Sequence, residues 1–186
     1  MSNEEQVTTS NDLHAVVISG GGAFGAWGVG VAQALAQDPK NPRKYSLGVG
    51  TSTGSLMGPL VLLQDFDTLI KAYTSVTQSD IFNVNPFKKN GKLRAFNFIK
   101  RVIQGKNTVG ETANLRKTIE RFFPEDDFNK LKSKNMEFTA ATVSMISGKT
   151  HYKSTNDHQY QDMVDWMWTS ANQPVLMSLE NKDNDY

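Results

Sequence analysis

Two runs of small residues in this sequence could carry chemistry, and the clearer one surrounds a serine. Gly50-Thr51-Ser52-Thr53-Gly54 fits the pattern G-x-S-x-G, in which the serine occupies a tight strand-to-helix turn and presents its hydroxyl as a nucleophile. The small flanking residues permit such a turn, and the start of the following helix supplies backbone N–H groups near the hydroxyl. We therefore predict that Ser52 is a catalytic nucleophile.

The second run, Gly20-Gly21-Gly22-Ala23-Phe24-Gly25, lacks large side chains at most positions, so its backbone can approach a ligand closely. Two functions are open for this loop. Gly20, Gly21, Gly22 and Gly25 could hold the oxyanion of a tetrahedral intermediate, where one donor contributes about 3 kcal/mol. Alternatively, the spacing Gly20-x-Gly22-x-x-Gly25 fits a dinucleotide fingerprint that binds a pyrophosphate.

The elements around the two runs favour the first function. A strand-like segment at 14–19 precedes the glycine loop, a helix-forming segment at 26–37 follows it, and a second strand at 45–50 leads into Ser52. This alternation predicts a parallel sheet with helices on its faces, in which ligands bind at the carboxyl ends of the strands. A dinucleotide site expects an acidic residue after the second strand, where this sequence has the serine turn. A packing role alone is the remaining alternative for both runs.

The rest of the chain is predicted to be a mixture of helices and strands within one domain. We expect helices over 66–76, 92–103, 113–123 and 161–170, and strands over 136–144 and 150–154. The apolar run at 14–19 is typical of a buried strand. Residues 1–12 are polar and predict a flexible tail, so the α/β domain is expected over 13–186.

With GGGAFG after a first strand and GTSTG after a second, the sequence resembles the patatin-like phospholipase family. Weaker similarities lie in residues 107–123 and in the turn Ser170-Ala171-Asn172-Gln173-Pro174. The resemblance implies a three-layer α/β/α sandwich that hydrolyses lipid acyl esters without a metal or organic cofactor. It also implies that Ser52 is the nucleophile and that the oxyanion loop consists of Gly20, Gly21, Gly22 and Gly25.

The sequence departs from the family pattern in two places. That family pairs its serine with an aspartate in an Asp-Gly-Gly or Asp-Gly-Ala motif, and this sequence contains no such motif. Asp183 and Asp185 lack the following glycine, so we expect an incomplete domain whose base lies beyond Tyr186 and a chain with weak or no activity. A catalytically inactive interaction module on the same fold is the alternative. Phe24 stands where many members carry arginine or lysine, which removes a fixed positive charge.

The composition excludes several other classes of function. Twenty basic and nineteen acidic residues leave a formal charge of +1, which gives no reason to expect a nucleic acid partner. The absence of cysteine excludes disulfides, thiolate metal sites and a cysteine nucleophile. The three histidines, His14, His151 and His158, have no metal-ligand spacing. His158 could act as a base, but a solvent-exposed role is favoured.

Lipid is the expected partner, and any membrane contact is expected to be peripheral. The sequence has neither a secretory signal nor a spanning apolar segment, which predicts a cytoplasmic protein. A basic run over 88–106 could rest on an anionic membrane, although an amphipathic helix packed on the core is the favoured interpretation. On the last predicted helix, core packing is favoured over an acyl pocket for Met163, Trp166, Met167 and Trp168.

Overall fold

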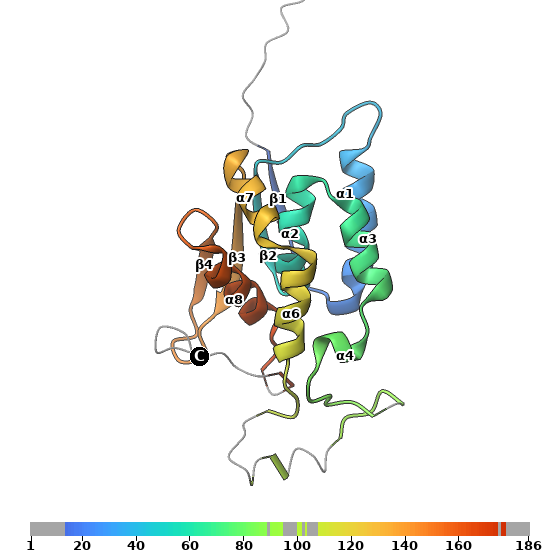
Figure 1. The fold of residues 1–186 in the computed structure, drawn as a ribbon, viewed down its shortest axis with the longest axis vertical. Coiled ribbons are helices and arrows are strands. Elements are labelled where there is room, and N and C mark those ends of the chain that lie inside the picture. Colours follow the sequence, from blue (N-terminus) through green and yellow to red (C-terminus); the bar gives the residue numbers. More distant parts are fainter. Residues whose placement is uncertain are drawn as a thin grey trace, which may run out of the picture.

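A computed structural model of the protein describes residues 14–88, 90–94, 100–101, 103, 108–174 and 176–177. Four strands of these residues form one sheet in the order β1-β2-β3-β4 (Figure 1). β1 (Ala15–Ile18), β2 (Leu47–Thr51) and β3 (Glu137–Val143) are parallel, and β4 (Thr150–Ser154) runs antiparallel to β3. The predicted α/β class with a mainly parallel sheet is confirmed, and the arrangement is consistent with the α/β/α fold.

The helices follow the predicted alternation, with three additions. The expected helices correspond to α1 (Gly25–Ala36), α2 (Thr53–Leu63), α3 (Phe66–Ser75), α6 (Ala113–Phe122) and α8 (Tyr160–Ala171). The short helices η1 (Gly22–Phe24) and α4 (Gln78–Ile81) and the longer α7 (Glu125–Ser133) were not predicted. Among the described residues, no helix is both long enough and apolar enough to cross a membrane.

The prediction of a buried first strand is wrong, because β1 lies at the edge of the sheet. Its residues alternate between exposed and half-buried, and Val17 is 77% exposed. Val16 and Ile18 face the core beneath α2, whereas Val17 lies on the opposite face with exposed Val143 and Tyr152. An edge strand of this kind reads as apolar in sequence although only one of its faces is covered.

Helix α2 packs directly on the sheet because glycines permit the close approach. A Cβ at Gly58 would lie 2.8 Å from Cδ2 of Phe138, and a Cβ at Gly48 would lie 3.2 Å from Cδ1 of Leu62. Leu60, Val61 and Leu62 are buried in the same core as Phe138. The helix that begins at the serine turn is therefore fixed to three strands by tight packing.

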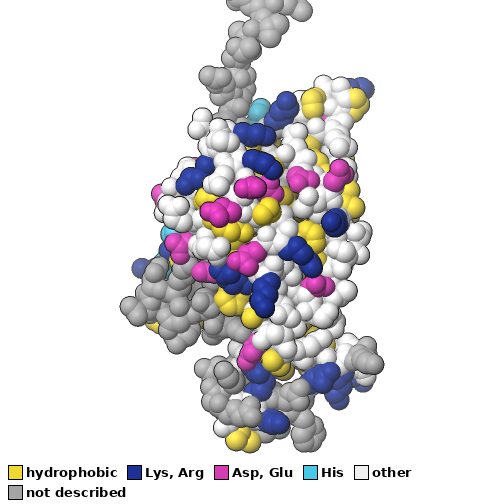
Figure 2. All heavy atoms as spheres, viewed as in Figure 1, with side chains coloured by type: hydrophobic (Ala, Val, Ile, Leu, Met, Phe, Trp, Pro, Cys, Tyr) yellow, Lys and Arg dark blue, Asp and Glu magenta, His cyan; other side chains and the backbone are white. Residues whose placement is uncertain are grey.

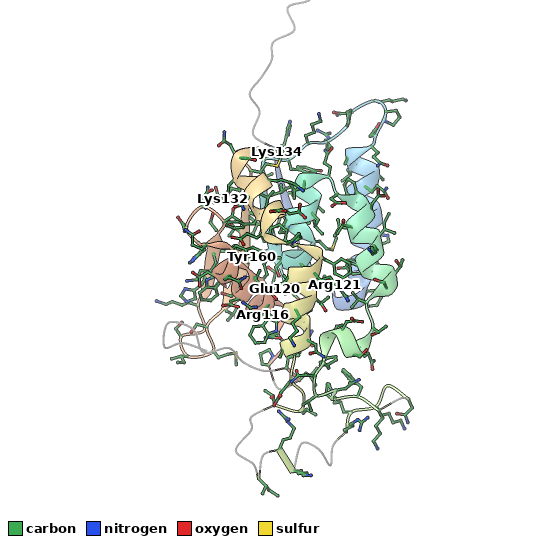
Figure 3. The ribbon with its side chains drawn as sticks, in the orientation of Figure 1. Arg116, Glu120, Arg121, Lys132, Lys134 and Tyr160 are labelled. Atoms are coloured by element: carbon green, nitrogen blue, oxygen red, sulfur yellow. The ribbon has the colours of Figure 1, made fainter. Side chains whose placement is uncertain are left out.

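Charged side chains join α6 to α8 on the outer side of these helices. Arg116 of α6 donates to Asp165 over 2.6 Å, to Glu120 over 2.7 Å and to Gln161 over 2.9 Å. Figure 3 shows Arg116 and Glu120 on α6, facing the region of Tyr160. Figure 2 shows basic and acidic side chains intermixed on this face of the molecule, as a formal charge of +1 leads one to expect.

The structure describes five of the seven basic residues of the run over 88–106, namely Lys88, Lys92, Arg94, Lys100 and Arg101. The tail over 1–12 lies outside the described residues. The helix predicted to begin at Lys92 is wrong at its start, because Leu93 pairs antiparallel with Phe87 and Lys88 donates its N–H to the Lys92 carbonyl over 2.7 Å. On the last helix, Met163, Trp166, Met167 and Trp168 are all buried in the core.

Candidate active site

Ser52 occupies a tight turn between β2 and α2, as its sequence pattern predicts. Its backbone has φ 54° and ψ −124°, a left-handed conformation that residues other than glycine rarely adopt. The flanking glycines are required by space, because a Cβ at Gly50 would overlap the Gly54 carbonyl and a Cβ at Gly54 would overlap the Ile18 carbonyl. The turn holds Ser52 at the carboxyl end of β2 and at the first turn of α2.

Hydrogen bonds from α2 and α8 hold this strained turn in place. The Ser52 N–H donates to Ser170 Oγ over 2.9 Å, and Ser170 Oγ donates to the Ala141 carbonyl of β3 over 2.6 Å. Ser55 Oγ donates to the Ser52 carbonyl over 2.6 Å and to the Met167 carbonyl over 3.2 Å. The backbone on both sides of the nucleophile is therefore tied to elements that are far apart in sequence.

The glycine loop lies directly against Ser52. A Cβ at Gly20 would lie 2.9 Å from Ser52 Cβ and 3.5 Å from its Oγ, so only glycine permits this approach. Gly22 has φ 54°, and within the described ranges the N–H groups of Gly21 and Gly22 donate to no acceptor. The structure thus brings the two predicted runs together at one rim of the sheet, as expected for the carboxyl ends of β1 and β2.

Gly25 differs from the other loop glycines because it packs inside the protein. It is buried at the start of α1, where a Cβ would overlap the Tyr73 hydroxyl and lie 2.9 Å from Thr53 Oγ1. Phe24, the residue that departs from the family pattern, is 86% exposed.

Tyr73 is a member of the site that sequence reasoning missed. Its hydroxyl forms a 2.5 Å hydrogen bond with Thr53 Oγ1 and joins α3 to the serine turn. Burial raises the pKa of Tyr73 above its ordinary value, while the hydrogen bond to Thr53 acts in the opposite direction. Neither Tyr73 nor Ser55 had a motif to mark it, whereas Ser170 belongs to the late turn that carried the resemblance.

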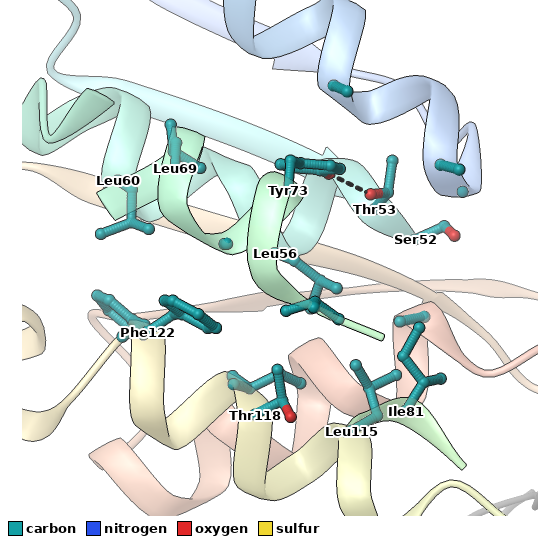
Figure 4. Close-up of a pocket in the computed structure, with 18 of the residues that line it drawn as sticks. Ser52, Thr53, Leu56, Leu60, Leu69, Tyr73, Ile81, Leu115, Thr118 and Phe122 are labelled. Carbon is teal, nitrogen blue, oxygen red and sulfur yellow. Dashed lines mark hydrogen bonds between the residues drawn. The ribbon is translucent and has the colours of Figure 1, made fainter. Parts of the chain in front are cut away.

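An apolar pocket of about 320 Å³ opens beside Ser52 (Figure 4). The serine and Thr53 lie at one end of the view, and Leu60, Leu69 and Phe122 lie toward the other. The walls come from α2, α3, α4 and α6, with the glycine loop at the mouth. The buried Met163, Trp166, Met167 and Trp168 do not line it, so core packing is the correct interpretation for them.

No described residue supplies an evident base. Within the described ranges, the Ser52 hydroxyl forms no hydrogen bond, and no group of three acidic or histidine side chains could hold a metal ion. His158 is half-buried rather than exposed, with its ring 6.1 Å from that of Trp166. It precedes α8, and Ser170 lies about 15 Å along the helix axis from Tyr160, the first residue of that helix. Asp183 and Asp185 lie outside the described residues.

Comparison with protein families gives a match over nearly the whole chain. The family model described as patatin-like phospholipase matches residues 16–186, a range that includes the glycine loop, the serine turn and α8. No curated protein matches the chain.

Proposed function

Because the chain belongs to the patatin-like phospholipase family, we propose that it is a lipid acyl ester hydrolase with Ser52 as its nucleophile. The family itself indicates lipid ester hydrolysis only in general terms. The observation that carries the finer assignment is the strained backbone of Ser52, with φ 54°, at the mouth of an apolar pocket. A serine whose backbone has a positive φ, and whose conformation long-range hydrogen bonds hold, is hard to explain by packing alone.

In the proposed reaction, Ser52 Oγ attacks the ester carbonyl carbon while a base accepts its proton. The carbonyl oxygen becomes an oxyanion, and collapse of this intermediate expels the alcohol and leaves an acyl-serine. Water then attacks the acyl-serine, and the fatty acid departs as Ser52 recovers its proton. The apolar pocket holds the acyl chain during both steps, so the ester carbonyl stays beside Ser52.

The oxyanion is proposed to bind the backbone of the glycine loop. Support comes from Gly20, which contacts Ser52, and from the N–H groups of Gly21 and Gly22, which donate to no acceptor within the described ranges. The N–H of Thr53, at the first turn of α2, is a further donor beside the nucleophile. Gly25 contributes by letting α1 pack against Tyr73 rather than by binding the oxyanion.

The base is proposed to be an aspartate outside the described residues. A serine hydroxyl without a base is a weak nucleophile at neutral pH, so this contact decides how active the protein is. The absence of a hydrogen-bond partner for Ser52 Oγ among the described residues also supports a second candidate, an inactive interaction module. A nucleotide site is less well supported, because the pocket walls are mostly apolar side chains.

A fluorophosphonate probe tests the nucleophile directly, because Oγ displaces fluoride and keeps the phosphonyl group. We expect one adduct on Ser52 by mass spectrometry, lost in Ser52→Ala and retained in Ser75→Ala, an exposed serine on α3. Labelling with measurable hydrolysis of a p-nitrophenyl ester supports the hydrolase. Labelling without hydrolysis supports the inactive module, and no Ser52 adduct after prolonged incubation overturns the nucleophile assignment.

Peripheral contact with a lipid surface is proposed from side chains around the pocket mouth. Phe24 is 86% exposed and Trp27 is 77% exposed, and they alternate along the chain with the mouth residues Ala23 and Ala26. Lys88 and Lys92 are exposed in the hairpin that follows α4. The hairpin follows α4 at the end of the molecule where α1 begins (Figure 1). Aromatic side chains beside the mouth and basic ones at the same end suit a surface of phospholipid. The cytoplasmic location stays a prediction.

A further inference from the structure

The pocket beside Ser52 is a slot between three helices, and its lining residues recur every three or four positions along each of them. On α2 the wall residues are Leu56 and Leu60, four positions apart, which places them on one face of the helix. α3 contributes Leu69, Ala72, Tyr73 and, just beyond its end, Val76, and α6 contributes Leu115, Thr118, Ile119 and Phe122. Spacings of three and four on each helix make a slot that runs parallel to the helices.

The length of this slot follows from the helix rise. From Ser52 to Leu60 the rise is about 12 Å, and from Leu115 to Phe122 it is about 10 Å. An extended chain advances about 1.2 Å per bond, because three backbone bonds of a polypeptide span about 3.6 Å. The slot therefore accommodates about eight to ten carbons of one straight acyl chain beyond the ester carbonyl.

The far end of the slot is closed by large side chains. Leu60 and Leu69 are each 2% exposed, and Phe123 is 1% exposed. Phe122 lines the slot and is half-buried, and the Arg121 guanidinium carbon lies 4.7 Å from the centre of its ring. Figure 4 shows Phe122 at the end opposite Ser52. A longer chain would have to displace this ring.

The polar groups of the wall are already paired within the protein. Thr118 Oγ1 donates to the Asp80 carbonyl over 2.7 Å, and the Thr53 and Tyr73 hydroxyls bond to each other. An acyl chain with a hydroxyl or other polar group inside the slot would meet mostly apolar wall residues and would lose its own hydration. The wall therefore favours an unsubstituted hydrocarbon chain.

We propose that Phe122 sets the acyl-chain length, so that the protein selects unsubstituted acyl chains of about eight to ten carbons. This inference rests on the proposed function and names the substrate class of that site. Affinity rises with each methylene that the slot covers, by about fourfold per carbon, and stops rising at the Phe122 ring.

Alkyl fluorophosphonates with chains of four to sixteen carbons test the inference on the full chain. The rate of Ser52 labelling is expected to rise to a maximum near eight to ten carbons and to fall at least tenfold by fourteen. Phe122→Ala should move the maximum to longer chains. Phe87→Ala, an aromatic substitution outside the slot, should leave it unchanged. Equal labelling at all lengths, or a maximum that Phe122→Ala does not move, overturns the length limit.

Two further measurements guard against ambiguous outcomes. Ala72→Phe fills the middle of the slot from α3 and should shorten the accepted chain even if Phe122→Ala does not fold. Displacement of a fluorescent fatty acid from Ser52→Ala by saturated fatty acids reports chain length without any labelling. A length limit in this assay without Ser52 labelling in the parent protein supports the slot and overturns the nucleophile. Labelling of Ser52 at a rate that does not depend on chain length supports the nucleophile and overturns the slot.

Discussion

At the scale of single residues, the backbone conformation that presents the Ser52 hydroxyl also destabilises the protein. Ser52 keeps φ 54° and ψ −124° although a side chain makes this conformation costly by about 1–3 kcal/mol. The Ser170 and Ser55 hydrogen bonds hold the turn against that cost. The strain is therefore local to one residue, and its relief should be measurable without disturbing the fold.

Ser52→Gly is expected to be more stable than Ser52→Ala by about 1 kcal/mol, because glycine adopts this conformation without strain. Alanine keeps the Cβ and with it the strain, so the comparison isolates the backbone from the lost hydroxyl. Urea unfolding followed by circular dichroism measures the difference. Equal stability of the two variants would mean that the turn is relaxed in solution.

Protonation of the Tyr73 hydroxyl makes the stability of the protein depend on pH in the alkaline range. Burial raises its pKa, so the folded protein holds the phenolic proton more tightly than the unfolded chain does. Its contribution to stability is complete below the unfolded pKa of about 10 and is lost as the pH rises through the folded pKa. Tyr73→Phe should reduce the loss of stability above about pH 10, measured as the urea midpoint between pH 8 and 11. Tyr152→Phe, an exposed substitution on β4, is the matched control.

At the scale of elements, the position of α2 depends on Gly58. Alanine is the better helix former by about 1 kcal/mol, yet a Cβ here would lie 2.8 Å from Cδ2 of Phe138. Gly58→Ala should therefore destabilise the protein by about 1–3 kcal/mol through overpacking. Gly30→Ala on α1, with nothing within 4 Å of the added Cβ, should stabilise it by up to about 1 kcal/mol.

Thermal unfolding of both glycine variants and of Gly58→Ala/Phe138→Leu checks this prediction. The smaller leucine side chain in place of Phe138 should restore part of the stability lost by Gly58→Ala, because it vacates the space of the ring edge. If Gly58→Ala and Gly30→Ala changed stability equally, helix propensity rather than packing would set the effect.

Elements marked by a sequence motif could be predicted from the sequence. The helix that was missed and the strand whose position was wrong show where the sequence pattern is not enough. The strand before Ser52 and the helix after it follow from the pattern itself. α7 was missed although Glu125, Asp126 and Asp127 in its first turn and Lys130 and Lys132 in its last suit the helix dipole. The edge position of β1 could not be predicted, because an apolar run does not reveal which strands flank it.

At the scale of the whole molecule, the exposed aromatic side chains predict binding to lipid vesicles. Trp27 is exposed, whereas Trp166 and Trp168 are buried, so a blue shift of tryptophan fluorescence on vesicle addition reports Trp27 alone. We expect this shift with phosphatidylcholine vesicles and tighter binding when phosphatidylserine is added. Trp27→Ala should abolish the shift, and Leu35→Ser at the far end of α1 should preserve it.

Two results would contradict this contact. A parent protein that shows no shift with either vesicle would remove Phe24 and Trp27 from the lipid-facing surface. A shift that is the same with and without phosphatidylserine would remove the contribution of the basic hairpin.

The site as a whole could be predicted only where its residues carry a motif. The carboxyl ends of parallel strands bring Gly20 and Ser52 together, and this juxtaposition follows from topology. Tyr73 and Ser55 come from helices whose local sequence reads as ordinary, and their roles depend on how the helices pack. No Asp-Gly-Gly or Asp-Gly-Ala motif marks the base in this sequence, so no local signal could place it.

The hydrogen bond between Ser52 N–H and Ser170 Oγ spans 118 residues, and this separation has a consequence for the order of folding. Contacts between distant residues form late, since the intervening chain must first be ordered. During synthesis, the serine turn emerges long before α8 and stays without its support until that helix docks. The nascent protein should therefore acquire its reactive serine as one of its last folding events, after the sheet has assembled.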